Sequence, residues 1–385
     1  MPDDRTYPEI RDAVSRLCDA FPGEYWRNLD ANSEYPTEFV RALTEAGYLS
    51  VLIPEEYGGS GLPLGAACAV LEEIQRSGGN GGACHAQMYT MGTLLRHGSA
   101  EQKERYLPGI ADGSLRLQAF GVTEPSSGTD TSRIRTTAVL DGGDYVVNGQ
   151  KVFISRTEHS DLMILLVRTA SREAGRKHTD GMSVLLVDLR EAVGNGLTIR
   201  PLATMMNHAS TELFFDNLRV PAENLIGREG DGFRCILDGM NAERILIAAE
   251  CIGDARWFTE KSARYARERE VFGRAIGENQ GVQFPIARAH IQTEAAALMV
   301  QKAADLYDAG QPAGAEANMA KLLASEAAWA AADTCVQTHG GYGFTAEYDV
   351  ERKFRETRLY QVAPISTNLI LSFIATQELG LPRSF

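Results

Sequence analysis

The chain has 385 residues, of which 44% are hydrophobic and 23% charged, so it can fold into a globular protein of two or three domains. Its net charge of −13 argues against a nucleic-acid-binding protein, which needs a basic surface. No apolar run is long enough to span a membrane, and the N-terminus does not read as a signal peptide. The six cysteines contain no CxxC pair, which indicates reduced, buried thiols in a cytoplasmic protein.

Residues 1–117 have the pattern of a helical region. FVRALTEAGYLSVLIP ends at a proline, and LGAACAVLEEIQRSGG ends on a glycine pair typical of a helix C-cap. The loop EEYGGSGLP between them follows no strand, so it is not a dinucleotide-binding fingerprint.

Residues 118–225 have a β pattern, with short apolar runs separated by turn signals. The runs are IRTTAVL, YVV, QKVFIS, LMILLVRT, MSVLLVDL, LTIRPL and TELFFDNLRV. Asn148-Gly149 between two of these runs predicts a hairpin turn. The polar insert at 170–181 is expected to be a solvated loop. This region is therefore predicted to be a small antiparallel sheet or barrel.

Residues 226–385 return to a helical pattern with long helices. Small apolar residues recur at helical spacing, which lets helix axes approach closely in a bundle. The first stripe is Ile245, Ala248, Ala249, Ile252 and Ala255, and the second is Ala320, Leu323, Ala324, Ala327, Ala328, Ala331 and Cys335.

Three stretches are candidates for ligand binding, although each can also be explained by local structure without a ligand. FGVTEPSSGTD (120–130) is dense in small and hydroxyl residues whose amides can cradle a phosphate or a flavin edge, but a simple turn-rich loop has the same composition. HGGYGF (339–344) either admits a bulky group close to its backbone or caps a helix. Arg269 precedes VFG at a charged helix end, where most arginines are only solvated.

Taken together, these stretches resemble the acyl-CoA dehydrogenase family over essentially the whole chain. The matching segments are FGVTEPSSGTD, NGQKVFIS, RVPAENLIGREGDGF, NAERILIAAECIG, ARERE with VFGRAI, and QTHGGYGFTAEYDVERKFRE. The first family signature is met except at its end, where Arg133 stands in place of a small residue. The second is met at Gln337, Gly340, Gly341, Gly343, Phe344, Glu347, Arg352 and Glu356.

The resemblance implies an α+β multidomain fold. Its parts would be an N-terminal helical domain (1–117), a middle antiparallel β-barrel-like domain (118–225) and a C-terminal four-helix bundle (226–385). It also implies a homotetramer in which each subunit holds one FAD between the middle domain and the bundle.

The same resemblance implies which residues contact FAD. Those expected within the subunit are Phe120, Val122 and Thr123 along the isoalloxazine, Gly128 and Thr129 towards the pyrophosphate, and Phe153, Ser155, Ser366 and Asn368. Those expected to reach the adenine-nucleotide half of a neighbouring subunit's FAD are Arg269, Phe272, Gln280, Gln337, Gly340 and Gly341.

The family's usual catalytic base is missing from this sequence. The family reaction removes the α-proton of an acyl thioester with a carboxylate, and many members supply it from a Tyr-Glu-Gly-Thr run. Here the run is Ala363-Pro364-Ile365-Ser366, and residues 357–377 contain no carboxylate. Pro364 also lacks the backbone N–H that helps to polarise the thioester carbonyl, so either Ile365 donates instead or this oxyanion site is weaker.

A second group in the family, the isovaleryl- and long-chain-type enzymes, carries the base on another helix, directly before an arginine. The matching position is Glu243, which the resemblance makes the expected base, with Asn241, Arg244 and Thr129 on the substrate side. The ordinary alternative is that Asn241 caps a helix and Glu243 interacts with the helix dipole in its first turn.

The expected activity is therefore the FAD-dependent α,β-dehydrogenation of an acyl-CoA, with an electron-transferring flavoprotein as acceptor. We expect no metal, nucleic-acid or membrane partner. The small Ala363 favours a short or branched acyl chain. Alternatives on the same fold are an acyl-carrier-protein thioester dehydrogenase, an enoyl-thioester reductase, an acyl-CoA oxidase or an inactive FAD-binding subunit.

Overall fold

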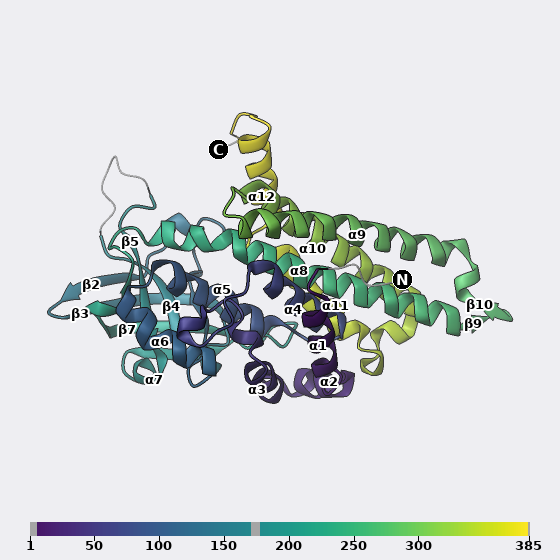
Figure 1. Cartoon of the computed structure of the whole chain (residues 1–385), viewed down its shortest axis with the longest axis horizontal. Coiled ribbons are helices and arrows are strands. Elements are labelled where there is room, and N and C mark those ends of the chain that lie inside the picture. Colours follow the sequence, from purple (N-terminus) through teal and green to yellow (C-terminus); the bar gives the residue numbers. More distant parts are fainter. Residues whose placement is uncertain (1–5, 171–177, 384–385) are drawn as a thin grey trace. The chain divides into compact units, whose positions relative to one another are not determined.

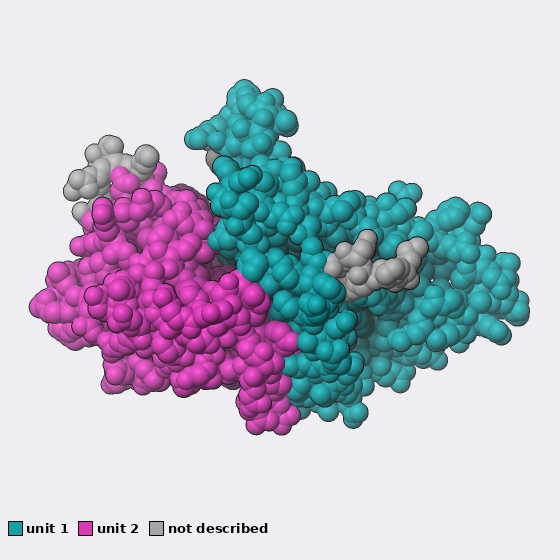
Figure 2. All heavy atoms as spheres, viewed as in Figure 1, with its two compact units in different colours: residues 1–32, 63–81, 241–385 teal, residues 33–62, 82–240 magenta. Residues whose placement is uncertain are grey.

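The computed structural model describes residues 6–170 and 178–383. Residues 171–177 of the predicted polar loop therefore lie outside the described part. The chain divides into two compact units (Figure 2). Unit 1 contains Met1–Asn32, Pro63–Gly81 and Asn241–Phe385, and unit 2 contains Ser33–Leu62 and Gly82–Met240. The three domain ranges expected from the sequence stay a prediction.

Unit 2 consists of helices packed on an eight-stranded sheet (Figure 1). Its helices are α3 (Thr37–Glu45), α5 (Gly82–His97), α6 (Ala100–Asp112) and α7 (Leu189–Ala192), followed by the first turns of α8 (Gly232–Glu268). Its strands are β1 (Leu117–Gly121), β2 (Thr137–Asp141), β3 (Asp144–Ser155), β4 (Leu162–Arg168), β5 (Met182–Asp188), β6 (Leu197–Pro201), β7 (Ser210–Pro221) and β8 (Leu225–Ile226).

The sheet runs in the order β6-β7-β3-β2-β4-β5-β8, with β1 paired to β4. Most neighbours are antiparallel, while β4 pairs in parallel with β1 and, at one position, with β2. Alternate residues of β4 face two different cores. Leu162 and Ile164 pack with α5 and α6, whereas Met163 and Leu165 pack with β3 and β7. A strand buried on both faces has no polar alternation, which explains the unbroken apolar run of β4.

The predicted hairpin turn at Asn148-Gly149 is wrong. The β2–β3 turn is formed by Gly142 and Gly143, with Gly142 at a φ of 67°, and β3 continues without interruption through Asn148. The Asn148 side chain instead bonds to Asn217 of β7, accepting from its backbone N–H at 2.9 Å. Asn217 has a φ of 52° at a shift in the β3–β7 register, so the Asn-Gly pair marks an irregular pairing inside the sheet.

A second register shift separates Lys151 from Ile154 in β3. There β3 carries one residue more than its partner β7, and Phe153 takes a left-handed φ of 58°. The bulge changes which residues point into the core, because Tyr145, Val147 and Lys151 are buried before it and Ile154 after it.

Unit 1 is helical and contains the predicted bundle. Its helices are α1 (Pro8–Cys18), α2 (Gly23–Asn32), α4 (Leu64–Arg76), most of α8, α9 (Gln280–Asp308), α10 (Gly314–His339), α11 (Val350–Val362) and α12 (Thr367–Phe373). A short hairpin of β9 (Glu270–Val271) and β10 (Arg274–Ala275) links α8 to α9. Figure 1 shows α8, α9 and α10 as long neighbouring rods, and α10 packs on both α9 and α11.

The small-residue stripes form the contacts of this bundle. All five residues of the first stripe, on α8, are buried. The second stripe, on α10, is buried as well except for Leu323, which is 42% exposed. Alanines at these positions let neighbouring helices pack closely, as the sequence predicted.

Glu243 does not lie in the first turn of its helix, as the alternative explanation from the sequence required. Helix α8 begins at Gly232, so Asn241 does not cap it and Glu243 lies about three turns inside. The helix dipole acts mainly on the first and last turns. The structure therefore removes that explanation for a glutamate at this position.

Residues Val350–Glu378 are long and apolar enough to qualify as a membrane span by length and composition. The segment is not one straight helix, because α11 ends at Val362 and α12 begins at Thr367 after a turn with a cis Ala363–Pro364 bond. A single such segment is weak evidence for a membrane span.

Candidate active site

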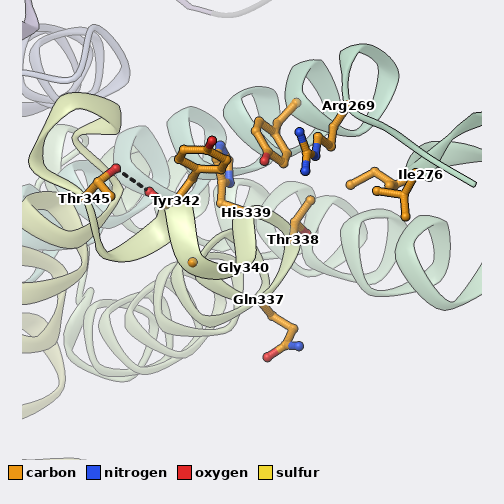
Figure 3. Close-up of a pocket in the computed structure, with 11 residues that line it drawn as sticks. Arg269, Ile276, Gln337, Thr338, His339, Gly340, Tyr342 and Thr345 are labelled. Carbon is orange, nitrogen blue, oxygen red and sulfur yellow. Dashed lines mark hydrogen bonds between the residues drawn. The ribbon is translucent and has the colours of Figure 1, made fainter.

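A pocket of about 510 Å³ lies in unit 1, where the ends of α8 and α10 meet (Figure 3). Four residues predicted to bind the adenine-nucleotide half of FAD line it together: Arg269, Gln337, Gly340 and Gly341. The lining also includes Tyr265 and Tyr342, which the sequence did not single out. The geometry thus brings together two segments about 70 residues apart in the sequence.

The lining of this pocket combines aromatic rings with glycines. The Arg269 guanidinium carbon lies 5.9 Å from the centre of the Tyr342 ring, and Tyr265 stacks on His339 with ring centres 4.2 Å apart. A Cβ added at Gly340 or Gly341 would meet no atom within 4 Å, so the backbone there is open to a ligand. Such a surface suits a flat base and a phosphate chain.

The other unit 1 residues predicted to bind FAD do not line this pocket. Phe272 is fully exposed at the tip of the β9–β10 hairpin, and Gln280 begins α9. Ser366 caps α12, its hydroxyl accepting from the N–H of Leu369 at 3.4 Å, and Asn368 is exposed on the same helix.

The predicted base lies elsewhere in unit 1, on α8. Glu243 is only 7% exposed. Arg244 beside it donates from Nη1 to Asn241 Oδ1 at 2.9 Å. Burial lowers the pKa of Arg244, and the charge of Glu243 partly opposes that effect. Asn241, Glu243 and Arg244 thus form one local group on α8, while Thr129, the other predicted substrate-side residue, belongs to unit 2.

The turn that lacks the usual base is tied to α10 in the same unit. The fully buried Lys321 donates from Nζ to the carbonyl oxygen of Ile365 at 2.9 Å. Burial lowers the pKa of Lys321, and the charge of Arg244 lowers it further. Lys321 therefore ties the Ala363–Ser366 turn to α10.

Unit 2 carries the predicted flavin loop. Phe120 is near the end of β1, and Val122 and Thr123 follow it as half-buried residues. Gly128 and Thr129 are exposed, and a Cβ at Gly128 would meet no atom within 4 Å. The backbone of this loop is therefore open to a large ligand at one end and packed at the other.

Phe153 and Ser155 lie at the end of β3, past the bulge. Phe153 is 66% exposed, and Ser155 is half-buried opposite Ser210 of β7. Within unit 2, the exposed ring of Phe153 and the open backbone at Gly128 suit contact with a flat aromatic ligand such as a flavin.

Models of the acyl-CoA dehydrogenase N-terminal, middle and C-terminal domains match residues 5–114, 119–218 and 230–377. The chain belongs to the acyl-CoA dehydrogenase family. An acyl-CoA dehydrogenase of Mycobacterium tuberculosis is 37% identical over 379 residues, covering 98% of this chain and 96% of the relative.

Solved structures agree with this assignment. A glutaryl-coenzyme A dehydrogenase in complex with glutaryl-CoA superimposes with a TM-score of 0.90 at 31% identity, covering 99% of this chain and 98% of the other. The FAD complex of PigA has a TM-score of 0.90 at 26% identity, covering 99% and 100%. The family assignment shows that this acyl-CoA dehydrogenase is an FAD-dependent oxidoreductase acting on acyl-CoA, with the helical–β–helical fold expected from the sequence.

Several residues around these sites were missed in the sequence. Tyr265 and Tyr342 line the pocket in unit 1, Lys321 holds the proline turn, and Lys151 bonds to Glu124 of the flavin loop. A signal was present for Lys151, because a lysine in the apolar run QKVFIS is unusual at a buried strand position.

Proposed function

We propose that this enzyme dehydrogenates its acyl-CoA substrate with Glu243 as the base that removes the α-proton. One observation supports this most strongly. Glu243 is a buried carboxylate in the middle of α8, while the turn at Pro364, where many family members carry the base, has none.

The burial of Glu243 needs a reason that the helix alone does not supply. A buried carboxylate costs free energy, and its position about three turns into α8 gives it little from the helix dipole. A carboxylate sheltered from water also binds a proton more readily, which suits a group that must deprotonate a weakly acidic thioester. In this proposal, the burial of Glu243 serves its role as the base.

The rest of the proposed mechanism assigns roles to the neighbouring side chains. Arg244, held by Asn241, lies next to the base on the substrate side, and Thr129 contacts substrate from unit 2. FAD would be held along its ring system by Phe120, Val122 and Thr123 and would supply the acceptor for the hydride from the β-carbon. Phe153 and the loop at 120–130 shield the cofactor from water, and the pocket around Arg269 and Gly340 holds an adenine nucleotide.

The test is Glu243→Gln, with flavin bleaching measured anaerobically over a panel of acyl-CoA substrates. The amide keeps the shape of the side chain but cannot take up the α-proton, so we expect bleaching to slow by about 10²- to 10⁴-fold. The matched control is Glu260→Gln on the same helix, because Glu260 is exposed and pairs only at the surface with Arg76. This control is expected to bleach like the wild type.

Equal bleaching of Glu243→Gln and wild type would refute the base assignment. No bleaching of the wild type by any acyl-CoA would favour an acyl-carrier-protein substrate, a reductase or an inactive subunit. The small Ala363 supports a short or branched acyl chain, which the same panel measures. Reoxidation by an electron-transferring flavoprotein in preference to O₂ would support the proposed acceptor.

We also propose that the protein is a cytoplasmic homotetramer. The fully exposed Phe272 and an apolar stripe on α9 support contact with a second copy. Phe284, Ile291 and Leu298 recur at seven-residue spacing on α9, and each is more than half exposed. A monomeric mass in light scattering would contradict this proposal.

A further inference from the structure

Lys151 on β3 is a lysine without any exposure to solvent. Its Nζ donates to the carbonyl oxygen of Val122 at 2.9 Å and to Glu124 Oε1 at 3.0 Å. Both acceptors belong to the loop at 120–130. An isolated charge in such a place would be very costly, so these two contacts must account for its presence.

Glu124 is held equally firmly from the other side. Its Oε2 accepts the N–H of Arg135 at 2.6 Å, and its Oε1 accepts the N–H of Thr136 at 2.9 Å. Burial by itself raises the pKa of Glu124, but Lys151 and these N–H groups together bring it below its usual value. Burial lowers the pKa of Lys151 to about 8, and the charge of Glu124 opposes that effect.

The pair acts on the backbone of the loop. The Lys151 side chain fixes the carbonyl of Val122, and the N–H of the next residue, Val152, donates to the carbonyl of Thr123 at 3.0 Å. Glu124 and Ser127 then bond to each other through their backbones. Residues 122–124 are thereby attached to β3 one after another, and Val122 and Thr123 are proposed flavin contacts.

Stability alone does not explain this arrangement. Apolar side chains of similar volume often replace a buried ion pair without loss of stability. An apolar side chain cannot hold the carbonyl of Val122, however, because it has no donor. The carbonyl contact is therefore the part of the arrangement that only a lysine-like donor supplies.

We propose that Lys151 is a positioning residue that holds residues 122–124 in the conformation that binds FAD. This inference rests on the proposed assignment of Val122 and Thr123 as flavin contacts. Lys151 acts through the loop backbone and not on the reacting atoms.

The experiment separates positioning from stability with two measurements on the full-length protein. The dissociation constant of FAD is obtained by diluting the holoenzyme and following the fluorescence of released flavin. The free energy of unfolding is obtained by denaturant titration of the chain after FAD removal. The variants are Lys151→Met and the double variant Glu124→Gln with Lys151→Met. The control is Lys302→Met, which removes a lysine whose ion pair with Glu316 lies at the surface.

Lys151→Met leaves Glu124 as a buried, uncompensated charge, so we expect it to lose both stability and FAD affinity. The double variant removes both charges and is expected to recover most of the stability. Its FAD dissociation constant is expected to remain about 10- to 100-fold above that of the wild type, because the Val122 carbonyl has lost a charged donor. Lys302→Met is expected to match the wild type in both measurements.

Recovery of FAD affinity together with stability in the double variant would overturn the inference, because Lys151 would then only neutralise Glu124. Wild-type affinity in Lys151→Met would overturn it as well. A wild type that binds no FAD would instead refute the proposed cofactor site, and this inference with it.

Discussion

Buried charges are compensated by backbone groups in unit 2 and mainly by other side chains in unit 1. In unit 2, Lys151 and Glu124 pair with each other and with the carbonyl or N–H groups of Val122, Arg135 and Thr136. In unit 1, Lys353 of α11 bonds to Asp254 of α8 at 2.5 Å and to Gln75 of α4 at 2.7 Å.

The difference follows from where free backbone groups exist. Loops beside a sheet leave N–H and C=O groups that a side chain can bond, whereas a helix interior uses its own. The bundle therefore relies on a network of side chains, and its buried cations reach backbone groups at points where helices end. One such contact is the bond from Lys321 to the carbonyl of Ile365, and others lie just past the end of α4. There Arg352 donates to the carbonyl of Gly78 at 2.8 Å, and Lys353 donates to that of Gly79 at 2.9 Å.

The largest effect is expected for Lys353→Met in unit 1. This change leaves the buried Asp254 without its cation and with the Thr357 hydroxyl as its remaining donor, while Glu356 keeps its ion pair with Arg352. We expect the free energy of unfolding to fall by about 3 to 5 kcal/mol in a denaturant titration. A loss below about 1 kcal/mol would show that the bundle compensates its charges as readily as the loop in unit 2.

A smaller effect is expected for the acid stability of unit 2. The folded-state pKa of Glu124 lies below its usual value, so its contribution to stability is complete above about pH 4.3, the unfolded value, and is lost as the pH falls through the folded value. Denaturant titrations between pH 3 and 7 should therefore show a steeper loss below pH 4.3 for wild type than for Glu124→Gln with Lys151→Met. Parallel profiles would mean that Glu124 does not contribute in this way.

The smallest effect is expected for Arg219→Gln, because the charge of Arg219 is exposed and already solvated. Arg219 is 55% exposed and pairs with Asp141 at 2.7 Å and Asp144 at 3.2 Å. We expect a loss of at most about 1 kcal/mol in the free energy of unfolding, and less at high salt. A larger loss of unfolding free energy that does not depend on salt would show that this surface ion pair contributes as much as the buried pairs.

Local sequence patterns predicted much of the fold. The alanine stripe of α8 and the apolar runs of β4 and β5 were visible because burial repeats with the period of the element. The Asn-Gly pair was misread because the same residues that favour a two-residue turn also suit an irregular pairing within a sheet. The start of α8 was misplaced because Asn241 resembles a cap, while the turns before it lack the usual signals.

The site was predicted in pieces and less completely. Family signatures indicated Arg269, Gln337 and the two glycines at 340 and 341, and the structure brings these four into one pocket. The ion pair between Lys151 and Glu124 was not predicted. These residues are 27 positions apart, and they meet only because the sheet brings β3 next to the loop at 120–130. Ion pairs between residues far apart in the sequence depend on three-dimensional packing, so a single sequence contains no periodic pattern that predicts them.

Outside the bulge between Lys151 and Ile154, regular pairing makes the length of β3 a constraint on evolution, separate from the identity of its residues. Deleting one of the two residues between them would remove the bulge and restore regular alternation, in which Ile154 still faces the core and Ser155 still faces outwards. Substitutions can be tolerated one at a time along this strand, but an insertion or deletion in its regularly paired part would exchange the inner and outer faces of the residues beyond it. We therefore expect related sequences to vary in composition along β3 far more readily than in residue number.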